Sequence, residues 1–219
     1  MGYVLKYKYI LFDLDGTLTD SQEGITKSVQ YALKYFDIIE EDLSKLICFI
    51  GPPLKDMFCE KYGFSEEVAL KAIERYRERF SELGWAENAL YPGVKETLEK
   101  LRSKGFILAV ASSKPEFFVK RILENFNIQE YFQVIVGSEL DGTRSNKCEV
   151  VQESMKRLNL EAEDRKLCVL VGDKIHDVEG AHICGIDCIG ASYGFGSAEE
   201  LQEAEYVIKS INELPLLII

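Results

Sequence analysis

Outside residues 19–89, the chain alternates short apolar runs with stretches of helical periodicity. The apolar runs predict strands at residues 9–12, 106–111, 133–136, 167–171, 188–190 and 206–208. Apolar residues spaced by three and four positions predict helices at residues 94–103, 116–125, 148–158 and 178–183. Strands separated by helices pair in parallel, with right-handed crossovers. The sequence therefore predicts an α/β fold with a Rossmann-like, doubly wound parallel sheet.

Residues 19–89 interrupt this alternation with helical patterns alone. One amphipathic pattern covers residues 25–36 and continues over residues 40–47. Another begins after Ser65, which is the predicted N-cap of a long helix. No strand is predicted between residues 19 and 88. We therefore expect an all-helical cap domain inserted after the first strand of the core, with the core formed by residues 1–18 and 90–219 and the cap by residues 19–89.

Composition narrows the class of protein. The 219 residues include 47% hydrophobic and 29% charged residues, as in ordinary globular proteins. A formal net charge of -11 argues against a nucleic-acid polymer or an anionic membrane as partner. No apolar stretch approaches the length of a membrane span or a signal peptide. The six cysteines show no Cys-x-x-Cys spacing, which favours free thiols and a cytoplasmic location.

Acidic residues follow two of the predicted strands directly. Asp13 and Asp15 come after residues 9–12, although aspartate is rare within strands. Taken alone, this pair also fits an Asp-Gly turn with a spare acid. Asp173 and Asp177, however, follow a second strand, and parallel sheets bind ligands at the carboxyl ends of their strands. We therefore expect the acids to meet there, with a cation or a proton reducing their repulsion.

Hydroxyl and cationic side chains follow two further strands. Ser112 and Ser113 end one strand, and Lys147 opens a helix. Carboxylates suit Mg²⁺, and a hydroxyl and an ammonium beside the metal suit a phosphoryl group. Asp13 is then placed to attack phosphorus and form an aspartyl-phosphate. Asp15 is placed to protonate the leaving alcohol and later to deprotonate water.

These segments resemble the motifs of the haloacid dehalogenase superfamily. Asp13-Leu14-Asp15-Gly16-Thr17-Leu18 is similar to its first motif and Ala111-Ser112-Ser113-Lys114-Pro115 to its second. Lys147 resembles the third motif, and Gly172-Asp173-Lys174-Ile175-His176-Asp177 resembles the fourth. A helical insertion just after the first motif resembles the C1-type cap of phosphoglycolate phosphatase-like members. The resemblance covers nearly the whole chain.

The resemblance implies a role for each matching residue. Asp13 is the implied nucleophile and a Mg²⁺ ligand, and Asp15 is the implied acid/base, with its backbone carbonyl on the metal. Ser112, with Ser113 beside it, and Lys147 are the implied phosphate-binding residues. Asp173 is the implied third metal ligand and Asp177 a supporting acid. The cap loop that ends at Lys55 faces the site in related proteins, so Lys55 is an expected substrate contact.

One position departs from the family pattern. Many close relatives carry proline after the motif lysine, whereas Cys148 follows Lys147 here. Arg144 is close enough in sequence to be a substitute or additional cation, so both basic residues remain candidates.

Together these residues predict a Mg²⁺-dependent phosphatase that acts on a small phosphorylated metabolite, such as 2-phosphoglycolate or a nucleoside monophosphate. A sugar-phosphate mutase of the β-phosphoglucomutase kind is an alternative, because it uses the same aspartyl-phosphate. A non-catalytic phosphate-binding protein of the same fold is a third possibility, although Asp13 and Asp15 are both present. The sequence pattern leaves the oligomeric state open.

Overall fold

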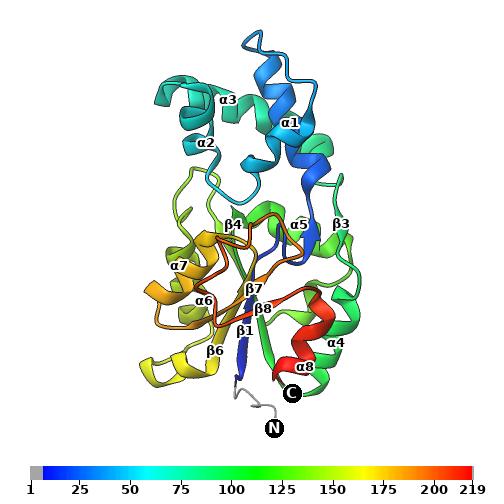
Figure 1. The fold of residues 1–219 in the computed structure, drawn as a ribbon, viewed down its shortest axis with the longest axis vertical. Coiled ribbons are helices and arrows are strands. Elements are labelled where there is room, and N and C mark those ends of the chain that lie inside the picture. Colours follow the sequence, from blue (N-terminus) through cyan, green and yellow to red (C-terminus); the bar gives the residue numbers. More distant parts are fainter. Residues whose placement is uncertain (1–6, 219) are drawn as a thin grey trace. The chain divides into compact units, whose positions relative to one another are not determined.

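The computed structural model of the protein describes residues 7–218. Six parallel strands form the main sheet in the order β5-β4-β1-β6-β7-β8 (Figure 1). These strands are β1 (Tyr9–Phe12), β4 (Ile107–Pro115), β5 (Val134–Ser138), β6 (Cys168–Gly172), β7 (Asp187–Ala191) and β8 (Tyr206–Ile208). The helices are α1 (Gln22–Lys34), α2 (Leu54–Tyr62), α3 (Glu66–Arg79), α4 (Val94–Ser103), α5 (Glu116–Asn125), α6 (Lys147–Arg157), α7 (Ile175–Ile183) and α8 (Leu214–Ile218). The predicted parallel α/β sheet is confirmed.

Strand β1 lies in the middle of the sheet. Its residues are buried and pair with β4 on one side and β6 on the other. Phe12 is in register with Val110 of β4 and Val171 of β6. Strands β1 and β6 therefore end almost level, while β4 continues beyond them. This register places the residues that follow β1 and β6 at one edge of the sheet.

Helices cover the sheet on both faces (Figure 1). α6 and α7 pack together on one face, and α4 and α8 lie on the other. Leu11, Leu170, Val151 and Val178 belong to the core between the sheet and the α6–α7 layer. Burying each such side chain contributes roughly 1.5–3 kcal/mol relative to leaving it exposed. The sheet is therefore closely packed against the α6–α7 layer.

The chain divides into two compact units, and the smaller one comprises Asp20–Ala89. It contains α1, α2 and α3, together with a 3₁₀ helix at Leu43–Phe49 and a π-helical turn at Phe80–Gly84. Its core is rich in aromatic residues, and the rings of Phe49 and Phe58 lie 4.9 Å apart between centroids. Ser65 accepts a hydrogen bond from the backbone N–H of Val68, which confirms it as the N-cap of α3.

Two short strands join the units and correct one prediction. Thr19–Asp20 (β2) pairs with Ala89–Leu90 (β3), although no strand was expected after residue 19. Two residues are too few to show the alternating pattern that identifies a strand. Helix α2 was also missed, because it directly follows the Gly51-Pro52-Pro53 sequence, which indicates a break.

Two boundary differences alter the surroundings of candidate site residues. Strand β4 continues to Pro115, beyond the predicted end at residue 111, with an irregular register between Ala111 and Pro115. Ser112 and Ser113 therefore lie within an extended segment. Helix α7 begins at Ile175, three residues before the predicted start, so Asp177 lies in its first turn.

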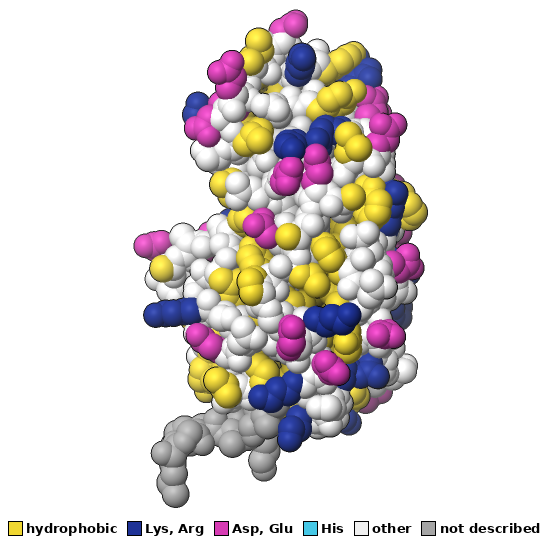
Figure 2. Space-filling view, turned by 90° about the vertical axis from the view of Figure 1, so that its right-hand side faces the viewer, with side chains coloured by type: hydrophobic (Ala, Val, Ile, Leu, Met, Phe, Trp, Pro, Cys, Tyr) yellow, Lys and Arg dark blue, Asp and Glu magenta, His cyan; other side chains and the backbone are white. Residues whose placement is uncertain are grey.

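Charges of both signs are interspersed on the surface. Figure 2 shows lysine and arginine side chains beside aspartate and glutamate on the face that it draws, with no continuous basic patch among the coloured residues there. Within residues 7–218, none of the helices combines the length and apolar character that a membrane crossing requires.

Candidate active site

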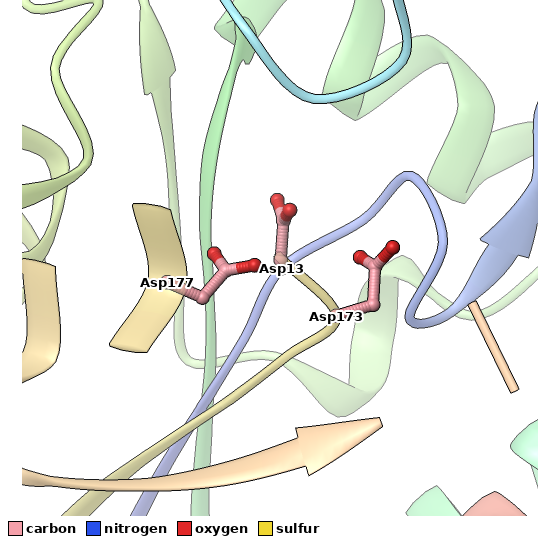
Figure 3. A group of neighbouring side chains, drawn as sticks. All are labelled: Asp13, Asp173 and Asp177. Atoms are coloured by element: carbon pink, nitrogen blue, oxygen red, sulfur yellow. The ribbon is translucent and has the colours of Figure 1, made fainter. Parts of the chain in front are cut away.

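Three buried carboxylates meet at the carboxyl edge of the sheet. Asp13 follows β1, Asp173 follows β6, and Asp177 lies in the first turn of α7. One carboxylate oxygen from each lies within 4.8 Å of the others, and Figure 3 shows how closely the three side chains gather. The exposed fractions are 5% for Asp13 and 0% for Asp173 and Asp177. Such a concentration of buried negative charge requires compensation.

Lys147 supplies part of this compensation. Its ammonium lies 3.0 Å from Oδ1 of Asp13 and 2.8 Å from Oδ1 of Asp177, and it donates a hydrogen bond to the carbonyl of Ala111. Burial alone would lower the pKa of Lys147, but the charges of Asp13 and Asp177 outweigh burial and raise it above its usual value. The residue is therefore a fixed cation. Asn146, the N-cap of α6, sets its position by accepting a hydrogen bond from the Cys148 N–H.

Asp173 lacks a cationic contact comparable to that of Asp13 and Asp177 among the ion pairs of the described residues. Its carboxylate accepts hydrogen bonds from the N–H of Phe195 at 2.8 Å and the hydroxyl of Thr17 at 3.3 Å. Burial and the neighbouring charges of Asp177 and Asp13 raise the pKa of Asp173 well above its usual value. Ionisation of Asp173 beside Asp13 and Asp177 is therefore unfavourable unless a further cation binds there.

The pKa of Asp177 is also raised, for a partly different reason. Burial is the main cause and the charge of Asp13 adds to it, whereas Lys147 acts in the opposite direction. The second carboxylate oxygen of Asp177 accepts a hydrogen bond from the Lys174 N–H at 3.0 Å, which fixes the side chain at the start of α7. Asp177 thus lies in the first turn of α7.

Glycines allow backbone segments to approach Asp173 closely. Gly16 has a φ of +83°, and a Cβ atom there would lie 2.2 Å from Oδ2 of Asp173. A Cβ on Gly196 would lie 1.8 Å from the Asp173 carbonyl oxygen. Both positions therefore require glycine. The loop at Gly194-Phe195-Gly196 therefore lies beside Asp173.

The side chain of Asp15 lies outside the three-carboxylate cluster and contacts Lys114. Oδ2 of Asp15 is 2.6 Å from the ammonium of Lys114, and both side chains are nearly buried. Oδ1 of Asp15 is also buried and has no hydrogen-bond partner in the described part of the chain. The sequence pattern places Lys114 in the second motif but predicts no role for it. Its position two residues after Ser112, on the same face of an extended segment, is the signal that could have identified it.

Ser112 is buried, and its hydroxyl accepts a hydrogen bond from the Lys114 N–H at 3.4 Å. Ser113 is held through its carbonyl, which accepts a hydrogen bond from the Ser138 hydroxyl at 2.8 Å. The two serines therefore form part of the same β4 segment that carries Lys114. This segment adjoins the carboxylate cluster through Ala111, whose carbonyl Lys147 contacts.

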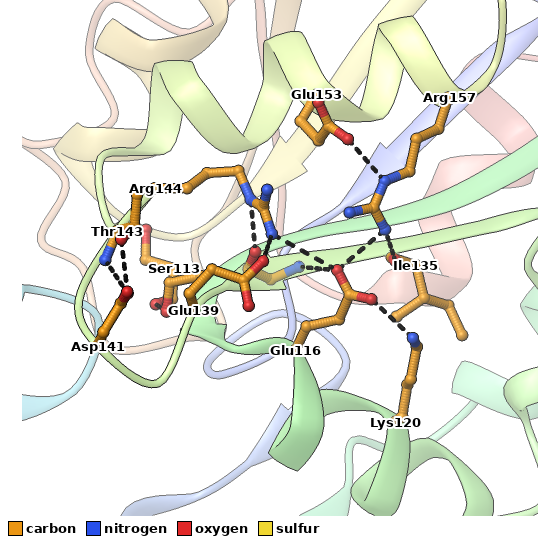
Figure 4. Close-up of polar contacts among 12 residues, drawn as sticks. Ser113, Glu116, Lys120, Ile135, Glu139, Asp141, Thr143, Arg144, Glu153 and Arg157 are labelled. Carbon is orange, nitrogen blue, oxygen red and sulfur yellow. Dashed lines mark hydrogen bonds and ion pairs between the residues drawn. The ribbon is translucent and has the colours of Figure 1, made fainter.

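Arg144 has a different set of partners (Figure 4). It donates a hydrogen bond to the Gly137 carbonyl at 2.9 Å, and its guanidinium forms ion pairs with Glu139 and Glu116. Lys147, by contrast, contacts the carboxylates directly. Lys55 belongs to the smaller unit, where its ammonium is 3.8 Å from Glu66.

The cluster suits a divalent metal ion. Carboxylate oxygens are the ligands that hard cations prefer, and three of them converge here. The raised pKa of Asp173 indicates that its ionised form would be stabilised by a bound cation. Asp13 and Asp173, the side-chain ligands expected from the sequence, both belong to this cluster, and their role as metal ligands stays a prediction. Asp177 joins them in the geometric cluster, while the backbone carbonyl of Asp15 stays a predicted ligand.

Comparisons with known proteins show the family of this chain. Residues 10–191 match the haloacid dehalogenase-like hydrolase family. A 5′-nucleotidase of Pseudomonas aeruginosa is 48% identical over 198 residues, which are 90% of this chain and 88% of the relative. The tyrosine-protein kinase PtkA of Mycobacterium tuberculosis is 39% identical over 201 residues, which are 91% of this chain and 67% of the relative. Several further relatives are named phosphoglycolate phosphatase.

A solved structure shows the same fold. The crystal structure of a predicted phosphatase from Clostridium acetobutylicum has a TM-score of 0.92 and 49% sequence identity, and the match covers 97% of this chain and 99% of that chain. Phosphatase names recur among the relatives and the solved structures, which supports a phosphatase-type hydrolase. The family match spans most of the chain and includes the strands that carry the buried acids. The chain therefore belongs to the haloacid dehalogenase-like hydrolases.

Proposed function

We propose that the protein is a Mg²⁺-dependent phosphatase that hydrolyses small phosphomonoesters through an aspartyl-phosphate on Asp13. The observation that carries the proposal is the meeting of Asp13 with Asp173, Asp177 and Lys147 at one edge of the sheet. Asp13 is the nucleophile in this account, since it directly follows the central strand and shares the cationic contact of Lys147.

The reaction proceeds in two displacements at phosphorus. A carboxylate oxygen of Asp13 forms a bond to phosphorus while the bond to the ester oxygen breaks, and Asp15 gives its proton to the leaving alcohol. Asp15 then takes a proton from water as the water oxygen attacks phosphorus, which releases phosphate and regenerates Asp13. The buried, unpartnered Oδ1 of Asp15 supports this role, because it is a free acceptor beside the nucleophile's strand end.

The remaining residues bind and neutralise the phosphoryl group. Lys147 supplies a fixed positive charge, and Ser112 and Ser113 supply polar groups on the adjoining strand. Asp13 and Asp173 would hold Mg²⁺, with the Asp15 carbonyl as a further ligand and Asp177 as support. The bound metal ion neutralises phosphoryl oxygens and reduces repulsion between the substrate and Asp13. Lys55 is proposed to contact the leaving group.

Nucleoside 5′-monophosphates are the proposed substrate class, with 2-phosphoglycolate as the main comparison. The name of the relative at 48% identity supports this choice. The cysteines among the described residues are free thiols, which supports a reducing, cytoplasmic compartment.

A phosphate-release panel tests the proposal. Wild type and Asp13→Asn are compared on nucleoside 5′-monophosphates, 2-phosphoglycolate and sugar phosphates, each with Mg²⁺ and with EDTA. We expect wild type to release phosphate only with Mg²⁺, fastest from a nucleoside 5′-monophosphate, and Asp13→Asn to be folded and inactive. Near-normal turnover by Asp13→Asn contradicts the mechanism. Isomerised sugar phosphate without phosphate release indicates a mutase, and transfer from ATP to a tyrosine peptide indicates a kinase.

A further inference from the structure

Two cysteine thiols face each other between α6 and α7. Cys148 is the second residue of α6, and Cys184 is the C-cap residue of α7. Their sulfur atoms lie 3.3 Å apart although the residues are 36 positions apart in sequence. Cys148 directly follows Lys147 in sequence. The phosphatase mechanism uses neither thiol.

The two thiols differ in their surroundings. Cys148 is partly exposed at the amino end of α6, and its sulfur accepts a hydrogen bond from the Gln152 side chain at 3.3 Å. Cys184 is 2% exposed, and burial together with its hydrogen bond to Cys148 raises its pKa to about 12. Cys148 is thus the thiol that an oxidant reaches first, and Cys184 is the protonated thiol held behind it.

We propose that Cys148 and Cys184 form an oxidation site in which a reversible disulfide lowers turnover by displacing Lys147. Hydrogen peroxide is the oxidant class. The Cys148 thiolate attacks one peroxide oxygen, the O–O bond breaks, and hydroxide leaves to form Cys148 sulfenic acid. The Cys184 thiol then attacks the Cys148 sulfur and displaces water as the S–S bond forms. In total, two thiols lose two electrons and two protons, and one peroxide becomes two waters.

The geometry couples this bond to Lys147. A disulfide requires a separation of about 2.05 Å, so the sulfurs must approach each other by about 1.2 Å. The side chain of Lys147 already lies tightly against α7, because a Cβ on Gly180 would be 2.6 Å from Cγ of Lys147. Drawing the start of α6 towards α7 therefore leaves Lys147 no room to keep its position between Asp13 and Asp177. A misplacement of about 1 Å near a reacting group can lower a rate by about 100-fold.

The effect on turnover rests on the proposed phosphatase function, but formation of the disulfide does not. The folded wild-type protein is titrated with hydrogen peroxide, and its peptides are mapped without reduction. We expect a Cys148–Cys184 peptide, a fall in phosphatase turnover of at least tenfold, and recovery of both thiols and turnover with dithiothreitol. Cys148→Ser and Cys184→Ala should keep full turnover before and after peroxide. Cys59→Ser, in α2 of the other unit, is the matched control and should respond like wild type.

Each contrary outcome identifies what has failed. A different pairing, such as Cys168 with Cys184, or oxidation of Cys148 that stops at sulfinic acid overturns the proposed disulfide, whatever the activity. Formation of the Cys148–Cys184 disulfide with turnover unchanged overturns its coupling to Lys147. If wild type has no phosphatase activity at all, the peptide map still decides whether the disulfide forms. Failure of the proposed phosphatase function is therefore distinguished from failure of the proposed oxidation site.

Discussion

The ammonium of Lys114 lies 2.6 Å from Oδ2 of Asp15, and both side chains are almost completely buried. This pair connects the extended β4 segment to the segment that follows β1. It also holds one oxygen of the proposed acid/base and leaves the other, Oδ1, without a hydrogen-bond partner among the described residues. The structure thus orients Asp15 separately from the carboxylate cluster.

Removing one partner of the Lys114–Asp15 pair should lower the stability of the fold. Lys114→Met leaves the Asp15 carboxylate buried without its cation, and we expect the free energy of unfolding to fall by about 3 kcal/mol. Urea titrations of Lys114→Met, Asp15→Asn and the double variant provide the measurement. The double variant should be more stable than Lys114→Met alone, because it removes the uncompensated charge. Strictly additive losses would show that the two side chains do not interact.

The raised pKa of Asp173 predicts how the stability of the metal-free protein depends on pH. Burial, together with the charges of Asp177 and Asp13, raises this pKa. A carboxyl group with a higher pKa in the folded state stabilises the fold at low pH, and this contribution is lost as pH rises from about 4 through the folded pKa. Unfolding free energies of wild type and Asp173→Asn in EDTA should therefore diverge with pH, with wild type falling relative to the variant.

Addition of Mg²⁺ should stabilise wild type more than Asp173→Asn, the opposite of the trend in EDTA. A ligand that binds only the folded protein at 100 times its Kd stabilises it by about 2.7 kcal/mol. With Mg²⁺ in place of EDTA at pH 7, the free energy of unfolding of wild type should rise by about this amount. The free energy of unfolding of Asp173→Asn should rise much less. An equal gain in both proteins would place the metal ion elsewhere.

Gly16 and Gly105 offer a matched test of the contact with Asp173. Their φ values are +83° and +86°, but a Cβ on Gly16 meets Asp173 whereas a Cβ on Gly105 meets nothing within 4 Å. Alanine at either position should cost about 1–2 kcal/mol of stability from the left-handed backbone alone. Only Gly16→Ala should also weaken Mg²⁺ binding, measured by calorimetry. Equal metal affinity in the two variants would contradict the close approach.

Substitution can distinguish the roles of Lys147 and Arg144 in turnover. Lys147→Met should lower kcat by at least 100-fold, because it removes the fixed cation between Asp13 and Asp177. Arg144→Met should change kcat by less than about threefold, because the ion pairs of Arg144 are with Glu116 and Glu139 and are largely structural. Steady-state kinetics on the preferred substrate decide between them. A large loss in Arg144→Met would restore it as a phosphate-binding candidate.

The helices and strands of the core could be predicted because the type of residue changes abruptly at their boundaries. The strand at residues 9–12 ends where Asp13 begins, and the helices at residues 94–103 and 116–125 directly follow a glycine and a proline. Residues 43–49 form a 3₁₀ helix where ordinary helical periodicity was expected, because both helix types place apolar residues at similar spacings. Short segments such as α2 and β2 carry too few residues for periodicity to identify them.

The site likewise contains some features that the sequence can predict and others that it cannot. That Asp13, Asp173 and Asp177 meet follows from their positions after parallel strands, which sequence can indicate. The spacing of Ser112 and Lys114 indicates a shared face, but the pairing of Lys114 with Asp15 also depends on the irregular register at the end of β4, which no local pattern encodes. Likewise, the Cys148–Cys184 contact depends on how closely α6 and α7 pack at Gly180.

The most direct test of the account is to trap the phosphorylated residue. Enzyme turning over its preferred substrate with Mg²⁺ is quenched and reduced with borohydride, which converts an aspartyl-phosphate to homoserine, and its peptides are sequenced by mass spectrometry. We predict homoserine at position 13 in wild type, and none in Asp13→Asn or without substrate. Homoserine at position 15 or 173, or a complete absence of reduced aspartate during rapid turnover, would contradict nucleophilic attack by Asp13.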